Sequence, residues 1–351
     1  MKPLKIAEEL YSRYETIHEV KNYYGLLAAW ALAEVAAESD EKELLNKVRS
    51  YLSLYPDKFP HPGYYSFELY RVGGMGKAYL LYKGLYNEER ENIRLYAEKT
   101  LLAPKNKDGI LSRPRQPWII WIDAAFSVVP FMLYSGLALG EEKYIDFAAN
   151  QVFLLYGELM DSTVGLLHQC KGYFENLDKP SEDHWSRGNG WGYIALSALV
   201  EHLPKESPHR PKAEELFKAH SAAILRTQNE RGVWRQEMPL EDSWEESSGT
   251  GIFAYGFGVG LRAGLLEKEI YEKPFHRAIA AIGEYFIGSD FSTKMCCSSC
   301  LCPGEGEEKG TVLAYITKVH SACDDPHSFG TLMLAMLEAH RNGIDDVKIG
   351  R

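Results

Sequence analysis

Residues 184–200 read HWSRGNGWGYIALSALV, a polar segment with two tryptophans followed by an almost unbroken apolar run. The run from Tyr193 to Val200 predicts a buried helix, because its apolar residues leave no polar face for solvent. The glycines on either side of Asn189 predict a turn, since glycine accepts positive φ and close contacts that other residues do not. We therefore expect residues 184–191 to form a loop that leads into a buried helix.

Helical periodicity also dominates the rest of the chain, and alternating patterns typical of strands are scarce. Apolar stripes at helical spacing cover about a dozen segments: 6–14, 23–37, 41–54, 68–85, 88–102, 118–139, 142–155, 191–203, 211–228, 251–265, 267–287 and 326–339. Short and medium connections join successive segments, which is typical of antiparallel helix pairs. The pattern predicts an all-α protein whose helix pairs are arranged in a ring.

Length and composition bound the class of protein. A chain of 351 residues with 45% hydrophobic content can bury roughly three quarters of its surface. We see no linker, so we predict a single domain over residues 1–351. The net charge of −10 and the lack of a long Lys or Arg run argue against nucleic acid or an anionic membrane as partner.

Targeting signals are not evident near the start of the chain. Residues 1–9 contain no apolar core of a secretory signal. The longest apolar stretch, residues 24–37, includes Glu34 and falls short of the ~20 residues that span a bilayer. We expect a cytoplasmic protein that does not enter a membrane.

Five of the six cysteines lie late in the chain, at Cys296, Cys297, Cys300, Cys302 and Cys323. Cys297 and Cys300 could offer two thiolates to zinc, but a structural zinc site normally takes a second pair from a separate position. Disulfides are rare in a reducing compartment. We favour a loop of small residues with reduced thiols over a zinc site.

Trp185, Arg187 and Trp191 combine two groups that bind sugar acids. Indole faces lie against the C–H face of a pyranose ring, and the planar guanidinium matches a carboxylate in two hydrogen bonds. A structural alternative is equally consistent with these residues: the tryptophans fill the core, and the arginine pairs with a nearby acid.

Asp123 is a single carboxylate within the apolar stretch WIIWIDAAFSVVPF, residues 118–131. Desolvation disfavours a charged carboxylate, so we expect a raised pKa, as a general acid near neutral pH requires. The alternative is an aspartate held by backbone N–H groups or a buried arginine.

Two further segments could complete a cleft. His168 lies on a predicted loop (GLLHQ, 165–169), and Ser248 lies in the polar stretch WEESSGTG, residues 244–251, before a glycine-rich helix. Either could instead be structural, the histidine at the surface and the serine as a helix cap. We expect the glycine-rich helix to contact neighbouring backbones closely, and His220 to be a core histidine. Phosphate loops, serine-hydrolase elbows and zinc-protease motifs are missing from the sequence.

With these residues in place, the chain resembles the unsaturated rhamnogalacturonyl hydrolases, glycoside hydrolase family 105, and more distantly the unsaturated glucuronyl hydrolases. The resemblance extends from about Tyr23 to Leu337. Its most specific parts are Trp121-Ile122-Asp123, Trp185-x-Arg187-x-x-Gly190-Trp191, Gly232-Val233-Trp234-Arg235-Gln236 and Glu246-Ser247-Ser248-Gly249-Thr250. It implies an (α/α)6 barrel with the active site in its open end.

The resemblance also implies the chemistry: hydration of the C4=C5 double bond in a terminal unsaturated uronic acid, with rhamnose as the expected next sugar. Asp123 matches the family's acid/base. Trp185, Arg187 and Trp191 match its substrate-contacting motif, and His168 matches a histidine of its binding loop. The implied partner is a small oligosaccharide, and the reaction requires neither metal nor cofactor.

This chain departs from the family at three places, one of which is the cysteine-rich segment 296–302, where a loop rich in glycine and serine is expected. Arg71 stands where a second aspartate is expected, and Glu68 is the nearest acid that could replace it. Arg113 follows Ser112 where the family often has a histidine, and its guanidinium could bind the substrate carboxylate. Two other functions stay open: a sugar epimerase or isomerase using His168, His184 or His327, and a non-catalytic carbohydrate-binding protein.

Overall fold

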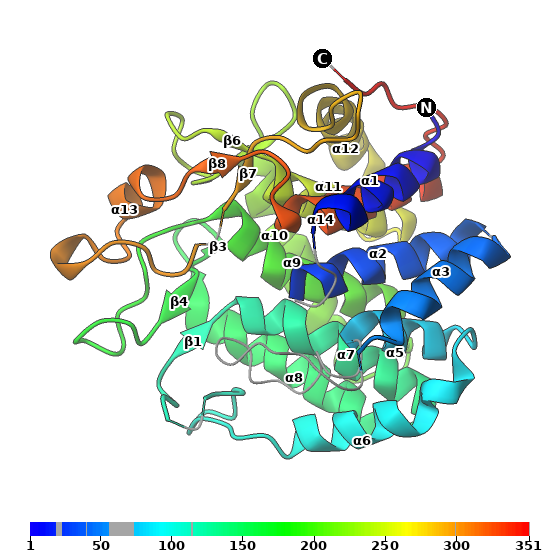
Figure 1. The fold of residues 1–351 in the computed structure, drawn as a ribbon. Coiled ribbons are helices and arrows are strands. Elements are labelled where there is room, and N and C mark those ends of the chain that lie inside the picture. Colours follow the sequence, from blue (N-terminus) through cyan, green and yellow to red (C-terminus); the bar gives the residue numbers. More distant parts are fainter. Residues whose placement is uncertain (19–22, 40, 56–73, 114, 299, 351) are drawn as a thin grey trace.

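The structure is a computed structural model that describes residues 1–18, 23–39, 41–55, 74–113, 115–298 and 300–350. Most of these residues are helical (Figure 1). The α-helices described are α1 (Pro3–Ile17), α2 (Tyr23–Ser39), α3 (Lys42–Leu52), α5 (Gly74–Tyr82), α6 (Arg90–Leu101), α7 (Asp123–Leu139), α8 (Glu142–Leu159), α9 (Ser186–His202), α10 (Arg210–Arg226), α11 (Ser247–Arg262), α12 (Lys268–Ala281), α13 (Val312–Thr317) and α14 (Pro326–Arg341).

Six helices form a closed inner ring in the order α2, α5, α7, α9, α11 and α14, with α14 packing back onto α2. These helices are apolar around most of their circumference and bury most of their residues; α9, for example, is buried from Ser186 to Val200. Helices α1, α3, α6, α8, α10 and α12 pack on the outside, each against one or two inner helices. Inner and outer helices alternate along the chain, which is the predicted (α/α)6 barrel.

Because each inner helix follows an outer one in an antiparallel pair, the inner helices run in the same direction. Three of them, α7, α11 and α14, begin within a few residues of the end of a short strand. These strands pair as β1 (Ile120–Trp121) with β4 (Cys170–Lys171), β2 (Met160–Asp161) with β3 (Leu166–Leu167), β5 (Trp234–Arg235) with β6 (Glu245–Glu246), and β7 (Cys296–Cys297) with β8 (Ser321–Ala322). Figure 1 shows the strands gathered on the left, at the end of the barrel where the inner helices begin.

The predicted loop at residues 184–191 is wrong, because α9 begins at Ser186 and includes most of this segment. Its glycines do not have positive φ. They make room for neighbours instead: a Cβ on Gly188 would lie 2.9 Å from the Trp185 ring, and one on Gly190 would lie 2.8 Å from the Ile252 side chain. Glycine therefore allows this helix to pack closely from its first turn.

Other helices also begin or end at residues that differ from the predicted ones. The segment 118–139 is helical only from Asp123, since Ile120 and Trp121 pair with β4. The segment 267–287 ends as an α-helix at Ala281 and continues as a π-helical turn, η2 (Ile282–Phe286). The first part of the predicted helix 68–85 lies outside the described residues.

The glycine-rich helix α11 contacts its neighbours as closely as predicted. A Cβ on Gly251 would lie 2.8 Å from the backbone of Thr331 in α14, and one on Gly256 would lie 2.1 Å from the Tyr193 ring in α9. Each Gly in a helix costs about 1 kcal/mol relative to Ala, so this close packing is what offsets the weak helix propensity of α11.

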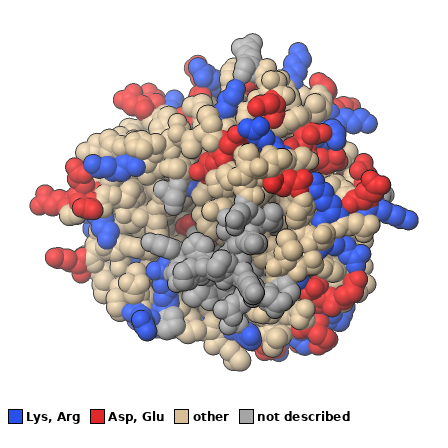
Figure 2. Space-filling model, in the orientation of Figure 1, with Lys and Arg blue, Asp and Glu red and all other residues tan. Residues whose placement is uncertain are grey.

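Within the described part of the chain, no helix is long and apolar enough to cross a membrane. Acidic and basic side chains are interspersed over the face of the molecule that Figure 2 shows.

Candidate active site

Asp123 is the first residue of α7, at the end of the barrel where the inner helices begin. The prediction of a carboxylate within a helix is therefore corrected: Asp123 lies in the first turn of a helix, where the backbone N–H groups carry partial positive charge. The side chain is still largely enclosed, with 7% of the residue exposed. The β1–β4 pairing and a hydrogen bond from Ile122 N to Gln169 O, 2.9 Å, hold this position beside the His168 segment.

Two tyrosines lie within the electrostatic reach of Asp123. Burial raises the pKa of Tyr23 and of Tyr173, and the negative charge of Asp123 adds to both shifts. The Tyr23 hydroxyl is hydrogen-bonded to Nε2 of His327, whose Nδ1 lies 2.7 Å from Oδ1 of Asp325. Tyr23 and Tyr173 were not among the predicted site residues, because a lone tyrosine in a helical or loop segment gives no signal in sequence.

Arg187 is almost completely buried, and its guanidinium donates hydrogen bonds to neighbouring groups of the protein. Its Nη1 lies 3.1 Å from Oγ of Ser248 and also donates to the Cys297 carbonyl, while its Nη2 lies 2.9 Å from the Ser298 carbonyl. Ser248 in turn donates to Oε1 of Glu246 over 2.6 Å. Arg187 and Ser248 thus lie together, as predicted for one site, and they anchor the cysteine-rich segment to the start of α9 and α11.

The two tryptophans of the motif are both buried at 1% exposure. Trp185 packs with Cys297, Cys300, Tyr315 and Val319, and the guanidinium carbon of Arg187 lies 4.6 Å from its ring centre. Trp191 stacks on Phe126 of α7, with ring centres 4.2 Å apart. Both tryptophans therefore fill the core around the site, and direct contact of either with a sugar stays a prediction.

The cysteine-rich segment is a buried support of this site, and all six cysteines are free thiols. Cys296 and Cys297 form β7, and Cys300 packs beside Trp185. Burial raises the pKa of Cys296 and of Cys300 well above its ordinary value. These thiols are thus neutral packing groups in the structure.

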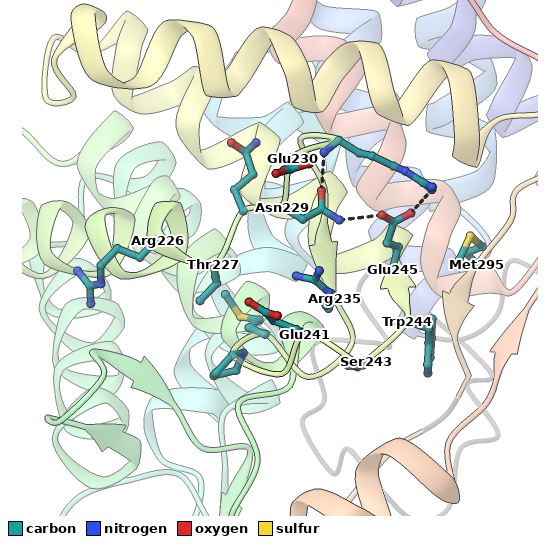
Figure 3. Close-up of a pocket in the computed structure, with 14 residues that line it drawn as sticks. Arg226, Thr227, Asn229, Glu230, Arg235, Glu241, Ser243, Trp244, Glu245 and Met295 are labelled. Atoms are coloured by element: carbon teal, nitrogen blue, oxygen red, sulfur yellow. Dashed lines mark hydrogen bonds and ion pairs between the residues drawn. The ribbon is translucent and has the colours of Figure 1, made fainter.

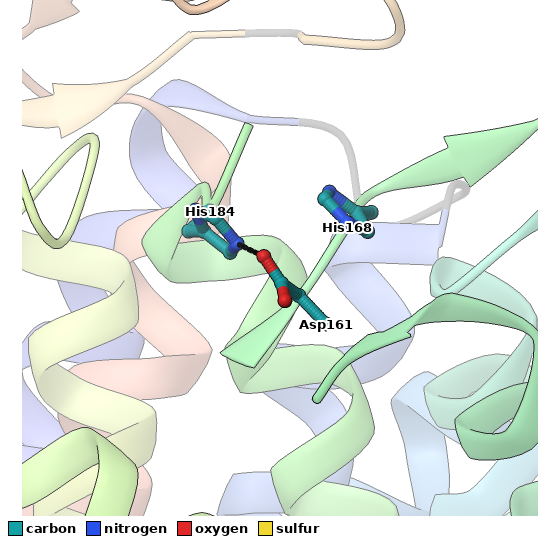
Figure 4. A group of neighbouring side chains, drawn as sticks. All are labelled: Asp161, His168 and His184. Carbon is teal, nitrogen blue, oxygen red and sulfur yellow. Dashed lines mark hydrogen bonds and ion pairs between the residues drawn. The ribbon is translucent and has the colours of Figure 1, made fainter. Parts of the chain in front are cut away.

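His168 lies in a cluster that sequence reasoning found only in part. Its Nδ1 is 3.2 Å from the Asp183 carbonyl, and its ring centre is 5.1 Å from that of His184. Nε2 of His184 lies 3.2 Å from Oδ2 of Asp161, as Figure 4 shows. Asp161 and Glu237 carried no signal in sequence, because they come from separate segments that only the fold brings to His184.

The remaining predicted site residues are Arg113 and Glu68. Arg113 is half-buried, and its guanidinium carbon lies 4.8 Å from the ring centre of Trp121, two residues before Asp123. It also reaches Gln116, with 3.4 Å between Nη1 and Oε1. Glu68 lies outside the described residues, as does Arg71.

A polar hollow of about 790 Å³ opens beside this region (Figure 3). It is lined by the loop before α11 and the end of α10, including Arg226, Asn229, Arg235, Glu241, Trp244 and Glu245. Asn229 Nδ2 and Arg231 Nη1 bind the Glu245 carboxylate at 2.7 and 3.1 Å. None of the predicted site residues lines this hollow, but Trp244 also packs against the Trp185 cluster.

Comparison with known proteins agrees with the predicted resemblance. The chain is 29% identical over 173 residues to an unsaturated 3S-rhamnoglycuronyl hydrolase of Formosa agariphila, covering 47% of this chain and 46% of that protein. It is 23% identical over 192 residues to an unsaturated rhamnogalacturonyl hydrolase of Bacillus subtilis, covering 51% and 52%. The aligned part thus spans about half the length of these curated relatives.

Solved structures match over nearly the whole chain. A family 105 glycoside hydrolase from C. acetobutylicum superposes with a TM-score of 0.80 at 20% identity, covering 97% of this chain and 100% of that one. A family 88 glycosyl hydrolase from Bacteroides vulgatus superposes with a TM-score of 0.75 at 22% identity, covering 97% and 98%. The sequence model described as Glycosyl Hydrolase Family 88 matches residues 10–343. With nearly its whole length matched by that model, the chain belongs to glycosyl hydrolase family 88.

Proposed function

We propose that this protein removes a terminal 4,5-unsaturated uronic acid from lyase-generated oligosaccharides, most directly from unsaturated galacturonyl-rhamnose, by hydrating the C4=C5 double bond. The observation that carries this proposal is the enclosed carboxyl group of Asp123 at the N-terminus of an inner helix, in a chain of glycosyl hydrolase family 88. The curated relatives of this chain are named as hydrolases of unsaturated rhamnoglycuronyl and rhamnogalacturonyl substrates.

The reaction needs one acid/base group and one water molecule. Asp123 gives a proton to C4, which leaves a positively charged, oxocarbenium-like centre at C5. Water adds to C5 as its proton returns to the Asp123 carboxylate, and a hemiketal forms. The hemiketal opens by breaking the bond between C5 and the ring oxygen, and the hemiacetal left at C1 then releases the aglycone. One water is consumed in all, and the glycosidic oxygen leaves with the aglycone.

The ends of the inner helices suit the charge of this substrate. Backbone N–H groups at helix N-termini favour an anion such as a uronate carboxylate, and α7, α9, α11 and α14 begin in this region. Arg113 is the predicted guanidinium partner of the carboxylate, while His168 is the predicted hydrogen-bonding group from the β3–β4 segment. Trp185, Arg187 and Trp191 are the predicted substrate-contacting motif, and in the fold they are buried at this end of the barrel.

One assay separates this reaction from its rivals. Loss of the ultraviolet absorbance of the conjugated double bond is followed together with release of free rhamnose from unsaturated galacturonyl-rhamnose. Hydration predicts that the two quantities rise together, one to one. An ordinary glycosidase acting at C1 would release rhamnose first. The absorbance would fall only later, as the freed unsaturated sugar opens its ring and its enol becomes a ketone.

The same assay tests the epimerase hypothesis, which the neighbouring rings of His168 and His184 keep open. An epimerase or isomerase would change the sugar while leaving both the double bond and the linkage in place. Absorbance loss that keeps pace with rhamnose release from the start of the reaction therefore supports hydration and contradicts both alternatives. Unchanged absorbance and linkage with every unsaturated uronide would contradict the proposal.

A further inference from the structure

We propose that Asp161, His168 and His184 form a binding site for one divalent transition-metal ion of the zinc class. The three residues each offer a donor atom, and these atoms all lie within 4.8 Å of one another. Nε2 of His184 and Oδ2 of Asp161 are already 3.2 Å apart. Tetrahedral zinc, with bonds of about 2.0–2.2 Å, holds its ligand atoms about 3.4 Å apart, so small side-chain movements suffice to close the site.

The surroundings of the two imidazoles are those of metal ligands. A histidine that binds a metal through one nitrogen generally donates its other N–H to a carbonyl or carboxylate. Nδ1 of His168 faces the Asp183 carbonyl at 3.2 Å, and Nδ1 of His184 faces Oε1 of Glu237 at 3.7 Å. The His168 ring therefore has a partner for its Nδ1–H, and the Nδ1 of His184 faces a carboxylate at ion-pair distance, so Nε2 is the nitrogen left for a metal in both rings.

The Asp161 carboxylate is also held in place by hydrogen bonds from its neighbours. Oδ1 of Asp161 accepts hydrogen bonds from the backbone N and the Oγ of Thr163, at 2.8 and 2.6 Å. These bonds fix the carboxylate plane and direct Oδ2 toward His184. Asp161 can thus act as a ligand through Oδ2 without giving up its own hydrogen bonds.

Backbone pairing holds the three ligands in place before any metal arrives. Asp161 lies on β2, and the β2–β3 pairing together with the bond from His168 N to Leu159 O, 2.9 Å, fixes the position of His168. His184 is anchored by its own backbone N, which lies 2.6 Å from Oε1 of Glu237. The side chains of His184 and Asp161 keep 13% and 20% exposure, so an ion can reach them from solvent.

The donor set indicates which metal fits. Two imidazoles and one carboxylate suit zinc and its first-row neighbours rather than magnesium or calcium, which prefer oxygen ligands. Three protein ligands also leave a position open for water or another ligand. A bound ion would join the β2–β3 hairpin to the start of α9 and fix the ring of His168.

Zn²⁺ binding to the chelator-treated full chain tests this inference without any measurement of activity. Isothermal titration and elemental analysis should show one Zn²⁺ per chain for the wild type. His168→Gln and His184→Gln should each weaken binding by at least 100-fold. His209→Gln is the matched control, since Nε2 of His209 also contacts an aspartate, Asp146, at 2.7 Å, but belongs to no group of three metal ligands among the described residues.

Two results would overturn the inference. One is wild-type protein that binds no more Zn²⁺ than His184→Gln, with circular dichroism showing both to be folded. The other is tight binding that survives in both histidine variants and is lost in Cys297→Ser, which would place the ion at the cysteines. Neither result depends on hydrolysis, so failure of the metal site and failure of the proposed function are distinguishable. The two claims share His168, because an ion on its Nε2 takes the ring nitrogen that would otherwise contact the substrate.

Discussion

Arg187 is the residue whose structural role differs most from its predicted one. A guanidinium proposed for a sugar carboxylate lies buried against the carbonyls of Cys297 and Ser298 and the hydroxyl of Ser248. The sequence could show that a planar hydrogen-bond donor stands here. Its partners could not be foreseen, because the cysteine-rich segment is more than a hundred residues away and carries no motif for arginine binding.

Removal of this guanidinium should destabilise the fold. Arg187→Met leaves buried carbonyl groups without a charged donor, so we expect the free energy of unfolding to fall by about 3 kcal/mol. Chemical denaturation measures the change. Arg226→Met is the control, because Arg226 donates to the Val164 carbonyl near the surface and should cost less than about 1 kcal/mol. Equal stability of Arg187→Met and wild type would show that Arg187 serves the substrate alone.

His220 is a predicted core histidine that the structure confirms. It is 1% exposed, its Nδ1 lies 2.8 Å from the Tyr156 hydroxyl, and its Nε2 lies 3.1 Å from Oδ1 of Asn189. The neutral ring with a proton on Nε2 satisfies both contacts. A helical stripe of apolar neighbours was enough to predict this, since burial and periodicity are local signals.

His220 should make the protein sensitive to acid. Burial lowers its pKa to about 3, whereas an unfolded chain has the ordinary value near 6.5. Between these two values the unfolded state binds the extra proton, so stability is complete above about pH 6.5 and falls as the pH is lowered toward 3. His220→Gln should flatten the dependence of unfolding free energy on pH between 7 and 4. If the slope of unfolding free energy against pH were the same in His220→Gln as in the wild type, the lowered pKa of His220 would be contradicted.

At the scale of elements, α11 shows that a glycine-rich segment can form a stable helix when its glycines allow close packing. The helix has poor propensity, yet its glycines lie against α9 and α14 at distances that a Cβ could not tolerate. Propensity is a local property and packing is not. The existence of the helix and its close contacts could be predicted, whereas the particular partners Tyr193 and Thr331 could not.

Two Gly→Ala substitutions test this account. Gly256→Ala places a Cβ 2.1 Å from the Tyr193 ring, so we expect a loss of about 3 kcal/mol as the core shifts. Gly157→Ala in the outer helix α8 has no atom within 4 Å of its Cβ and should gain about 1 kcal/mol from helix propensity. Thermal unfolding compares the two. A stabilising Gly256→Ala would contradict the close packing of α9 and α11.

Helix ends were the weakest part of the prediction. The start of α7 was placed five residues early, because the apolar pattern of Ile120 and Trp121 is the same whether they pair in a strand or continue a helix. The start of α9 was placed five residues late, because a Gly-Asn-Gly sequence is typical of a turn. The close tertiary contacts of Gly188 and Gly190 favour a helix over a turn in this segment.

At the scale of the whole molecule, a count of a dozen helical segments was enough to predict a ring of helix pairs. The order of that ring follows from chain order, since each inner helix packs on the next inner helix. The sequence placed Asp123, Arg187 and Ser248 in one site through the family resemblance. It gave no sign that the common direction of the inner helices also brings the hydrogen-bonded pair of Tyr23 and His327 to that end. The assignment of all 351 residues to a single domain stays a prediction.

The central claim is that Asp123 supplies the proton for hydration at this end of the barrel. The most direct test compares wild type with Asp123→Asn, which keeps the shape of the side chain and removes its proton, on unsaturated galacturonyl-rhamnose. We predict a fall in kcat/KM, measured by loss of ultraviolet absorbance, of about 10³-fold, while Asp178→Asn at an exposed position stays within about twofold of wild type. Full activity of a folded Asp123→Asn variant would contradict the claim.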